Sequence, residues 1–251
     1  DPVGGGLTYS VSVADSDLVE ATVVNNNRYW SLEIADYGTM VFEFFEDKAT
    51  RATDQFIELT EAGFYDGIIL HRVIDGFVIQ GGDPTGTGTS GSTLPDFDDQ
   101  FHVDLQHNQL GVLSMAKRND DTNNSQFFVT DGITQHLDFN HTIFGQLIEG
   151  FDVLEGITLA MTGAGDRPVE DIVISRATVF QDTENAVLTV RALDSSGTTS
   201  VTVTATDADG NSSSEVFDVS LAPSSRNSQP FLDDIPDFSA TRGSTLEFQL
   251  G

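Results

Sequence analysis

The 251-residue sequence contains no cysteine, which excludes disulfides, thiolate metal ligands and cysteine nucleophiles. It is also poor in basic residues: 11 Lys and Arg stand against 40 Asp and Glu, for a formal net charge of -29. Because nucleic-acid binding depends on Lys and Arg that displace counterions from phosphates, we expect no nucleic-acid partner. No apolar run reaches the roughly 18 residues of a membrane-spanning helix, so we expect no membrane insertion.

The remaining composition is that of a globular protein, with 38% hydrophobic residues. The large negative charge is typical of a solvated, repelling surface that keeps a protein soluble, and it suits an extracellular or cell-envelope location. The chain begins at Asp1 with neither an initiator Met nor a signal-type segment, so we interpret it as part of a longer protein.

Apolar and polar residues alternate at both ends of the chain, which is typical of half-buried strands. The N-terminal example is LTYSVSV at 7–13, and the C-terminal example is SVTVTAT at 200–206. The turn-forming DADGN at 207–211 then predicts a hairpin with the alternating residues around Phe217. A Ser- and Pro-rich stretch at 223–229 predicts a linker.

The middle of the chain has a different pattern. Residues 50–63 place Ala52, Phe56 and Leu59 at helical spacing and end in a glycine, which predicts a helix. Many strands and few helices indicate an antiparallel barrel or sandwich of ordinary domain size. The strand candidates are SLEI, MVFEFF, GIILHRVI, FVIQ, LGVLSMA, SQFFVT, HTIFGQLI and DIVISRATV.

The segment HRVIDGFVIQGGD at 71–83 places an arginine and a glutamine inside an apolar hairpin. A two-residue Asp-Gly loop would set Arg72 opposite Ile79, whereas a three-residue loop that includes Phe77 would set it opposite Gln80. The sequence leaves both registers open. In the second register a polar pair lies beside apolar residues on one face, which is the composition of a binding groove.

Three blocks, in the same order and at similar spacing, closely resemble the cyclophilins, a family of peptidyl-prolyl cis-trans isomerases. They are HRVIDGFVIQGGDPTGTG at 71–88, LGVLSMAKRNDDTNNSQFFVT at 110–130 and HLDFNHTIFGQLIEG at 136–150. The resemblance runs from about Ser31 to about Arg176, and GGDPTGTGTSGS is similar to the bacterial type. It implies a mainly β fold, a closed eight-stranded antiparallel barrel capped by two helices, without cofactor or metal.

The resemblance also implies an active site for proline-containing peptides or unfolded proteins. Its catalytic residues would be Arg72, Phe77, Gln80 and Phe128. Its other substrate-binding residues would be Val78, Ala116, Lys117, Gln126, His136, Leu137 and His141. The walls of the proline pocket would come from Phe77, Val78, Phe128 and Leu137.

Two positions depart from the family's usual pattern. Val78 replaces a Met, which is a small and still apolar change. His136 stands where several members have Trp. The resemblance therefore supports activity towards peptides better than it supports tight binding of the cyclic-peptide inhibitor cyclosporin.

The residue types also suit the chemistry. Rotation about an X-Pro bond breaks amide resonance, with a barrier of ~18–20 kcal/mol. A catalyst needs an apolar pocket for the ring and a fixed donor that favours the twisted amide. Arg72 stays charged and can donate to the prolyl nitrogen, and the backbone N–H of Lys117 could hold the neighbouring carbonyl.

Each functional interpretation has a structural alternative. Arg72 could pair with one of many surface carboxylates, and the aromatic residues could be ordinary core. No pair of histidines has HExxH spacing, which argues against metal catalysis by His71, His102, His107, His136 and His141. Calcium could bind at the repeat turns, where oxygen ligands would come from Asp207, Asp209, Asn211 and Glu215. Their spacing lacks the glycine-bearing twelve-residue pattern of a calcium-binding loop, so a plain hairpin turn is the stronger expectation.

The flanks resemble pieces of immunoglobulin-like or cadherin-like repeats of bacterial surface proteins, in LTYSVSVADSDLVEATVV and ENAVLTVRALDSSGTTSVTVTATDADGNSSSEVFDVSLAP. Residues 1–30 and 177–222 would then pair in one small β-sandwich, because isolated edge strands risk aggregation. Residues 31–176 would form the isomerase domain inserted between them. A linker and the start of a next repeat would occupy 223–251.

The leading hypothesis is a cofactor-free prolyl isomerase carried on a larger surface or secreted repeat protein. One alternative is a proline-motif binding module with little turnover, against which the presence of Arg72 and Gln80 argues. Another is a structural adhesin in which the domain is a decoration on the repeats.

Overall fold

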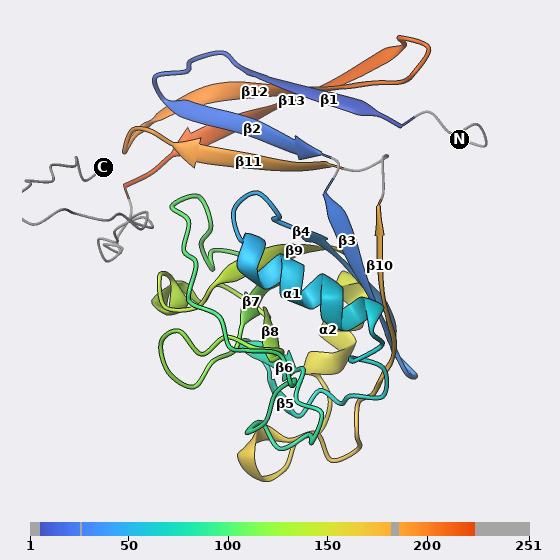
Figure 1. The fold of residues 1–251 in the computed structure, drawn as a ribbon. Helices are drawn as coiled ribbons and strands as arrows, with labels where there is room; N and C mark the ends of the chain where they lie inside the picture. The colour runs from blue at the N-terminus through green and yellow to red at the C-terminus, as the bar shows by residue number, and fades with distance from the viewer. Residues whose placement is uncertain (1–5, 26, 182–185, 224–251) are drawn as a thin grey trace, which may run out of the picture.

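The computed structural model describes residues 6–25, 27–181 and 186–223. Its body is an eight-stranded antiparallel sheet with the strand order β10-β3-β4-β9-β7-β8-β6-β5 (Figure 1). The bounds of these strands are β3 (Arg28–Ile34), β4 (Gly38–Phe44), β5 (Arg72–Ile74), β6 (Val78–Gly81), β7 (Val112–Met115), β8 (Phe127–Thr130), β9 (Ile143–Glu149) and β10 (Ile174–Gln181).

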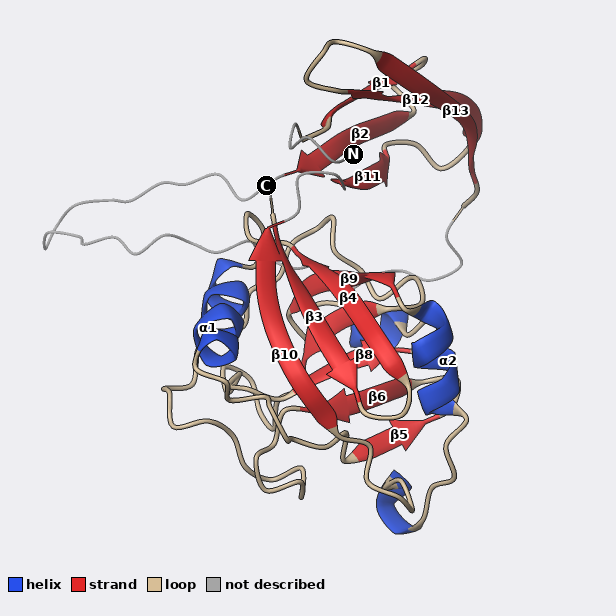
Figure 2. Ribbon diagram, turned by 90° about the vertical axis from the view of Figure 1, so that its right-hand side faces the viewer, coloured by secondary structure: helices blue, strands red, loops and turns tan. Residues whose placement is uncertain are grey.

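The sheet is strongly curled, as Figure 2 shows. The residues that precede its two edge strands approach each other through a single bridge between Ile69 and Val173. The N–H of Leu70 also donates to the carbonyl of Ile172 at 2.9 Å. Within the described residues β5 and β10 themselves form no ladder with each other. The mainly β antiparallel fold is thus confirmed as a curled sheet, whereas full closure of the barrel stays a prediction.

Two α-helices, α1 (Thr50–Glu61) and α2 (Phe151–Thr158), lie on opposite sides of the curled sheet (Figure 2). The helix expected at 50–63 is confirmed, with Ala52, Phe56 and Leu59 all buried on its inner side. It ends where Gly63 takes a positive φ of 71°, a conformation that glycine adopts without strain. Short 3₁₀ turns form η1 (Gln135–Leu137) and η2 (Ala164–Asp166).

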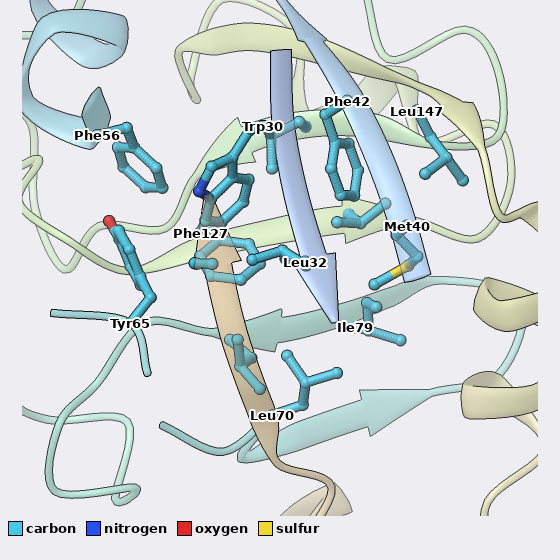
Figure 3. Packing of buried hydrophobic residues seen from close by; sticks show 14 of the residues in the cluster. Trp30, Leu32, Met40, Phe42, Phe56, Tyr65, Leu70, Ile79, Phe127 and Leu147 are labelled. Atoms are coloured by element: carbon cyan, nitrogen blue, oxygen red, sulfur yellow. The ribbon is translucent and has the colours of Figure 1, made fainter. Parts of the chain in front are cut away.

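The core is built around Trp30 of β3 (Figure 3). Its ring meets Phe127 and Tyr65 edge-on, with centroids 5.0 and 5.3 Å apart. The buried indole N–H donates to the hydroxyl of Thr60 in α1 at 2.9 Å. Edge-to-face pairs contribute roughly 0.5–1.5 kcal/mol each beyond the apolar area that they bury. This packing ties α1 to the strands and makes the sheet a rigid support for side chains on its other face.

The strands of the body extend beyond the expected bounds of 31 and 176. The ladder between β3 and β10 continues to the pair Arg28 and Gln181. The body therefore includes the residues at which both flanking segments join it.

The flanking segments form two small sheets at one end of the body (Figure 1). One contains β1 (Thr8–Val13), β12 (Gly197–Thr206) and β13 (Ser212–Leu221), and the other contains β2 (Val19–Asn25) and β11 (Ala186–Ala192). In both, an N-terminal strand pairs with a C-terminal one. An immunoglobulin-like or cadherin-like sandwich stays a prediction, and the predicted next repeat at 224–251 lies outside the described residues.

The hairpin expected around DADGN is confirmed by the ladder between β12 and β13. Asp207 closes its turn, because its carboxylate accepts the N–H groups of Asp209 and Asn211 at 3.0 and 2.8 Å. Calcium at this turn stays a prediction. None of the helices in the described part of the chain has the length and apolar character to cross a membrane.

Candidate active site

The hairpin of β5 and β6 decides between the two registers that the sequence left open. Ile74 pairs with Val78 and Arg72 pairs with Gln80, so the loop contains three residues and includes Phe77. The N–H of Phe77 donates to the carbonyl of Ile74 at 3.0 Å, and Gly76 takes a positive φ of 69°. Compared with a two-residue loop, this glycine-containing turn has one more residue. That extra residue shifts the register so that Arg72 and Gln80 lie opposite each other on the same face.

The polar pair continues as a row across the neighbouring strands. Gln80 of β6 lies opposite Phe128 of β8, and Phe128 lies opposite Ser114 of β7. Residues directly opposite each other in an antiparallel sheet project from the same face. Arg72, Gln80, Phe128 and Ser114 therefore stand in one line across four strands, and the row contains three of the four predicted catalytic residues.

Two glutamines hold each other in fixed orientations beside this row. The side-chain amide of Gln80 donates to the side-chain oxygen of Gln126 at 3.0 Å. Gln126 donates in turn to the carbonyl of Ser90 at 2.7 Å. Its own backbone carbonyl accepts the N–H of Ala116 at 2.9 Å. These hydrogen bonds determine which atom of each side-chain amide faces the groove.

A cavity of about 490 Å³ adjoins the glutamines. It is lined by Gln80, Ala116, Lys117 and Gln126, together with residues from the loops around 88–92 and 118–124. The ammonium of Lys117 contacts the carboxylates of Asp99 and Asp120, and the side chain is only 4% exposed. Because its charge is already paired, Lys117 offers its backbone rather than its ammonium to a ligand.

The predicted apolar walls fall into two contact pairs. Phe77 stacks on His136 of η1 with ring centroids 5.7 Å apart. The buried ring of Phe128 meets His141 edge-on at 5.4 Å. Val78 is buried at the start of β6. These residues supply apolar surface, as a pocket for a pyrrolidine ring requires.

Leu137 follows His136 in η1 and is half-buried. Nδ1 of His141 donates a hydrogen bond to the carbonyl of Met115 at 2.9 Å, because a carbonyl oxygen only accepts, and Nδ1 is therefore the protonated nitrogen. Burial lowers the pKa of His141 below its usual value, so the ring is neutral near pH 7.

Arg72 has a carboxylate neighbour that sequence reasoning missed. Its Nε lies 3.4 Å from Oδ2 of Asp166 in η2, and both side chains are substantially exposed. An exposed ion pair of this kind contributes only about 0–1 kcal/mol. It can orient the guanidinium without occupying it fully. The sequence gives no signal for this contact: the GAGD segment indicates a turn, in which Asp166 takes a positive φ of 61°, but it does not indicate Arg72 as a partner.

His107 is a second residue that the sequence interpretation did not place in the site. Its buried ring stacks on Phe128, with centroids 5.7 Å apart. Nδ1 lies 2.9 Å from the carboxylate of Asp138, and Nε2 lies 3.1 Å from the hydroxyl of Ser114. His107 therefore packs directly against Phe128, one of the residues predicted to form the proline pocket. The sequence around His107 does not reveal this contact, because its partner Asp138 lies 31 residues further along the chain.

In residues 6–25, 27–181 and 186–223, no three His, Asp or Glu side chains group as metal ligands would. The row and the residues around it combine an arginine, oriented amides and apolar side chains, which can bind a peptide and stabilise a polar group in it.

Comparisons with known proteins match the body of the chain. The family model for cyclophilin type peptidyl-prolyl cis-trans isomerase/CLD matches residues 29–179. Peptidyl-prolyl cis-trans isomerase ppi1 of Schizosaccharomyces pombe is 45% identical over 142 residues, which are 56% of this chain and 92% of the relative. Human peptidyl-prolyl cis-trans isomerase-like 1 is 43% identical over 142 residues, covering 56% and 86%.

A solved structure of a Cryptosporidium parvum cyclophilin type isomerase matches with a TM-score of 0.59 and 34% identity, covering 61% of this chain and 98% of that chain. These relatives are eukaryotic, so they do not support the bacterial type expected from GGDPTGTGTSGS, and they give no support to the repeat resemblance of the flanks. Because the family model covers more than half of the chain, this protein belongs to the cyclophilin-type peptidyl-prolyl cis-trans isomerase family.

Proposed function

We propose that the body of this protein exchanges the cis and trans forms of X-Pro bonds in peptides and unfolded proteins by stabilising the twisted amide. The observation that carries the proposal is the row of Arg72, Gln80 and Phe128 across β5, β6 and β8. A charged donor, an amide and an apolar wall project from the same face of a rigid sheet. That is the set of groups that this reaction requires.

The chemistry assigned to the row follows from the amide itself. As the X-Pro bond twists, resonance is lost and the lone pair returns to the prolyl nitrogen. Arg72 donates to that nitrogen through an N–H group of its guanidinium. A donor that interacts more strongly with the twisted amide than with either planar isomer lowers the barrier.

The neighbouring residues hold the substrate while the bond turns. Phe128 and Val78 provide apolar surface for the proline ring, and Phe77 extends it from the hairpin loop. Gln80 and Gln126, whose amides fix one another, present polar atoms to the peptide backbone. The backbone N–H of Lys117 serves the carbonyl that precedes the proline. One relative of the family has been solved in the presence of the dipeptide Ala-Pro, which supports a proline-containing ligand here.

The test is an exchange measurement on Ala-Pro and Gly-Pro model peptides by NMR line-broadening, with wild type and Arg72→Ala. Removal of one preorganised donor costs about 100- to 1000-fold in rate. We expect accelerated exchange that falls by about this factor in the variant. Asp166→Asn is the matched control, since it changes the neighbour of Arg72 and retains the donor. Peptides that bind without faster exchange would favour the proline-motif binding module instead.

We further propose that this domain works outside the cell, on a larger repeat protein. The proposal is supported by the pairing of N-terminal with C-terminal flanking strands and by the net charge of -29. Cell fractionation of the native host with an antibody to the isomerase body tests it. Recovery of the antigen in the cytosol would refute this location.

A further inference from the structure

The flanking strand β11 makes a charged contact with the isomerase body. Nε of Arg191 in β11 donates to Oδ1 of Asp104 at 2.6 Å. Lys48 of the body approaches the other carboxylate oxygen of Asp104 at 3.3 Å. The side chains of Lys48 and Asp104 are each only 11% exposed, whereas the side chain of Arg191 is 41% exposed. It joins the two parts of the chain across 87 residues.

The contact belongs to a broader apposition of the two parts. A cleft of about 250 Å³ is lined on one side by Leu188, Thr189 and Val190 of β11. On the other side it is lined by body residues that include Asp104, Leu105, Gln106 and Asn108. Figure 1 shows β11 at the end of the flanking unit that faces the body. The strand therefore lies over the segment 104–109, which has no regular secondary structure.

The same segment leads to the wall of the proline pocket. His107 is three positions after Asp104, and both its backbone N–H and its backbone carbonyl form hydrogen bonds. Its N–H donates to the Asp138 carboxylate at 2.6 Å, and its carbonyl accepts the N–H of Thr134 at 2.8 Å. Its ring stacks on Phe128. His107 is thus the buried residue through which the segment that contains Asp104 meets the ring of Phe128.

The electrostatics show how strongly Asp104 depends on its partners. Burial alone would raise the pKa of the Asp104 carboxyl, but the hydrogen bond from Arg191 and the charge of Lys48 outweigh it and hold the pKa below its usual value. Loss of Arg191 would leave the carboxylate of Asp104, which is 11% exposed, with fewer compensating contacts, and this favours movement of the loop toward water.

We propose that Arg191 of the flanking strand is a positioning residue for the isomerase: it anchors Asp104, and thereby holds His107 against Phe128. The inference rests on the proposed role of Phe128 as the wall of the proline pocket. Arg191 lies outside residues 29–179 that match the family model. The flanking unit would therefore tune an isomerase site to which it contributes no direct contact.

The test uses the full chain with Arg191→Ala, Arg191→Lys and the matched control Glu20→Gln. Glu20 of β2 is the other partner of Arg191, at 3.3 Å from Nη1, so its variant disturbs the flanking sheet and keeps the contact with Asp104. Coupling through packed side chains predicts a fall of about three- to tenfold in kcat/KM for R191A. Lysine at the same position should restore most of it, and E20Q should match wild type.

A second readout does not depend on activity. The ring resonances of His107 and Phe128 are expected to shift in R191A and to stay in place in E20Q. If R191A lowers only the melting temperature and leaves both kcat/KM and these resonances unchanged, the contact is merely structural and the proposal is wrong. If wild type accelerates no exchange, the proposed function fails, and the resonances alone still decide whether Arg191 positions the pocket wall.

Discussion

Glu43 offers a quantitative test of the forces in this fold. It lies in β4 with no exposed surface, and its Oε1 accepts a hydrogen bond from the amide of Asn27 at 3.0 Å. Its Oε2 has no hydrogen-bond partner among the described residues. Burial raises the pKa of Glu43 to about 7, against the lowering effect of the Asn27 hydrogen bond and with a smaller raising effect from Asp47.

The sign of the pH effect follows from linkage. The folded protein keeps the proton on Glu43 up to a pKa of about 7, whereas the unfolded chain releases it near 4.5. The contribution to stability is therefore complete below pH 4.5 and is lost as the pH rises through 7. Each pKa unit corresponds to about 1.4 kcal/mol, so the loss across this window is on the order of 3 kcal/mol.

Glu43→Gln removes the ionisation and keeps an oxygen for Asn27. We expect little difference from wild type near pH 4.5, because both side chains are then neutral. At pH 8 the variant should be more stable by about 3 kcal/mol, which corresponds to a melting temperature higher by roughly 5–10 °C. Urea unfolding at pH 4.5, 6 and 8 measures the difference, and isomerase activity confirms that both proteins are native.

The exposed Glu33 on the neighbouring strand provides the control for a change of surface charge. Glu33→Gln should change the free energy of unfolding by less than about 0.5 kcal/mol at every pH. A stabilisation by Glu43→Gln that is equal at pH 4.5 and pH 8 would contradict the burial argument. A loss of stability at pH 8 would contradict it as well.

Three further predictions concern the loop, the core and the pocket. Asp83 accepts N–H groups from several residues of the following loop, and these bonds outweigh burial and lower the pKa of its carboxyl to about 2. The wild type should therefore lose this stabilisation only as the pH falls from 3.8 to about 2, whereas Asp83→Asn should lack it at every pH, which acid titrations measure. Thr60→Val leaves the buried indole N–H of Trp30 without its acceptor, and urea unfolding should show a loss of about 1–3 kcal/mol. His136→Trp should retain the stack on Phe77 and enlarge its apolar surface, so titration calorimetry should show that the variant binds cyclosporin more tightly than the wild type does. Equal or weaker binding would refute the idea that residue 136 limits cyclosporin affinity.

Much of this protein could be predicted from residues that are close in the chain. The spacing of Ala52, Phe56 and Leu59 indicated α1, because one face of a helix has to be apolar to pack on a sheet. The turn at 207–211 indicated the hairpin of β12 and β13, because Asp, Asn and Gly accept the conformations of a tight turn. The three blocks at 71–88, 110–130 and 136–150 indicated the family, since they carry the local sequence around the predicted site.

The tertiary structure decided what depends on distant residues. The three-residue loop after β5 set Arg72 opposite Gln80, a choice between registers that alternation alone leaves open. The contact of Asp166 with Arg72 spans 94 residues, and that of Arg191 with Asp104 spans 87. Local sequence determines strands, turns and residue types, because these depend on neighbouring dihedrals and periodicity. Which charge meets which partner depends on how the sheet curls and where the flanking unit docks, and only the folded chain determines that.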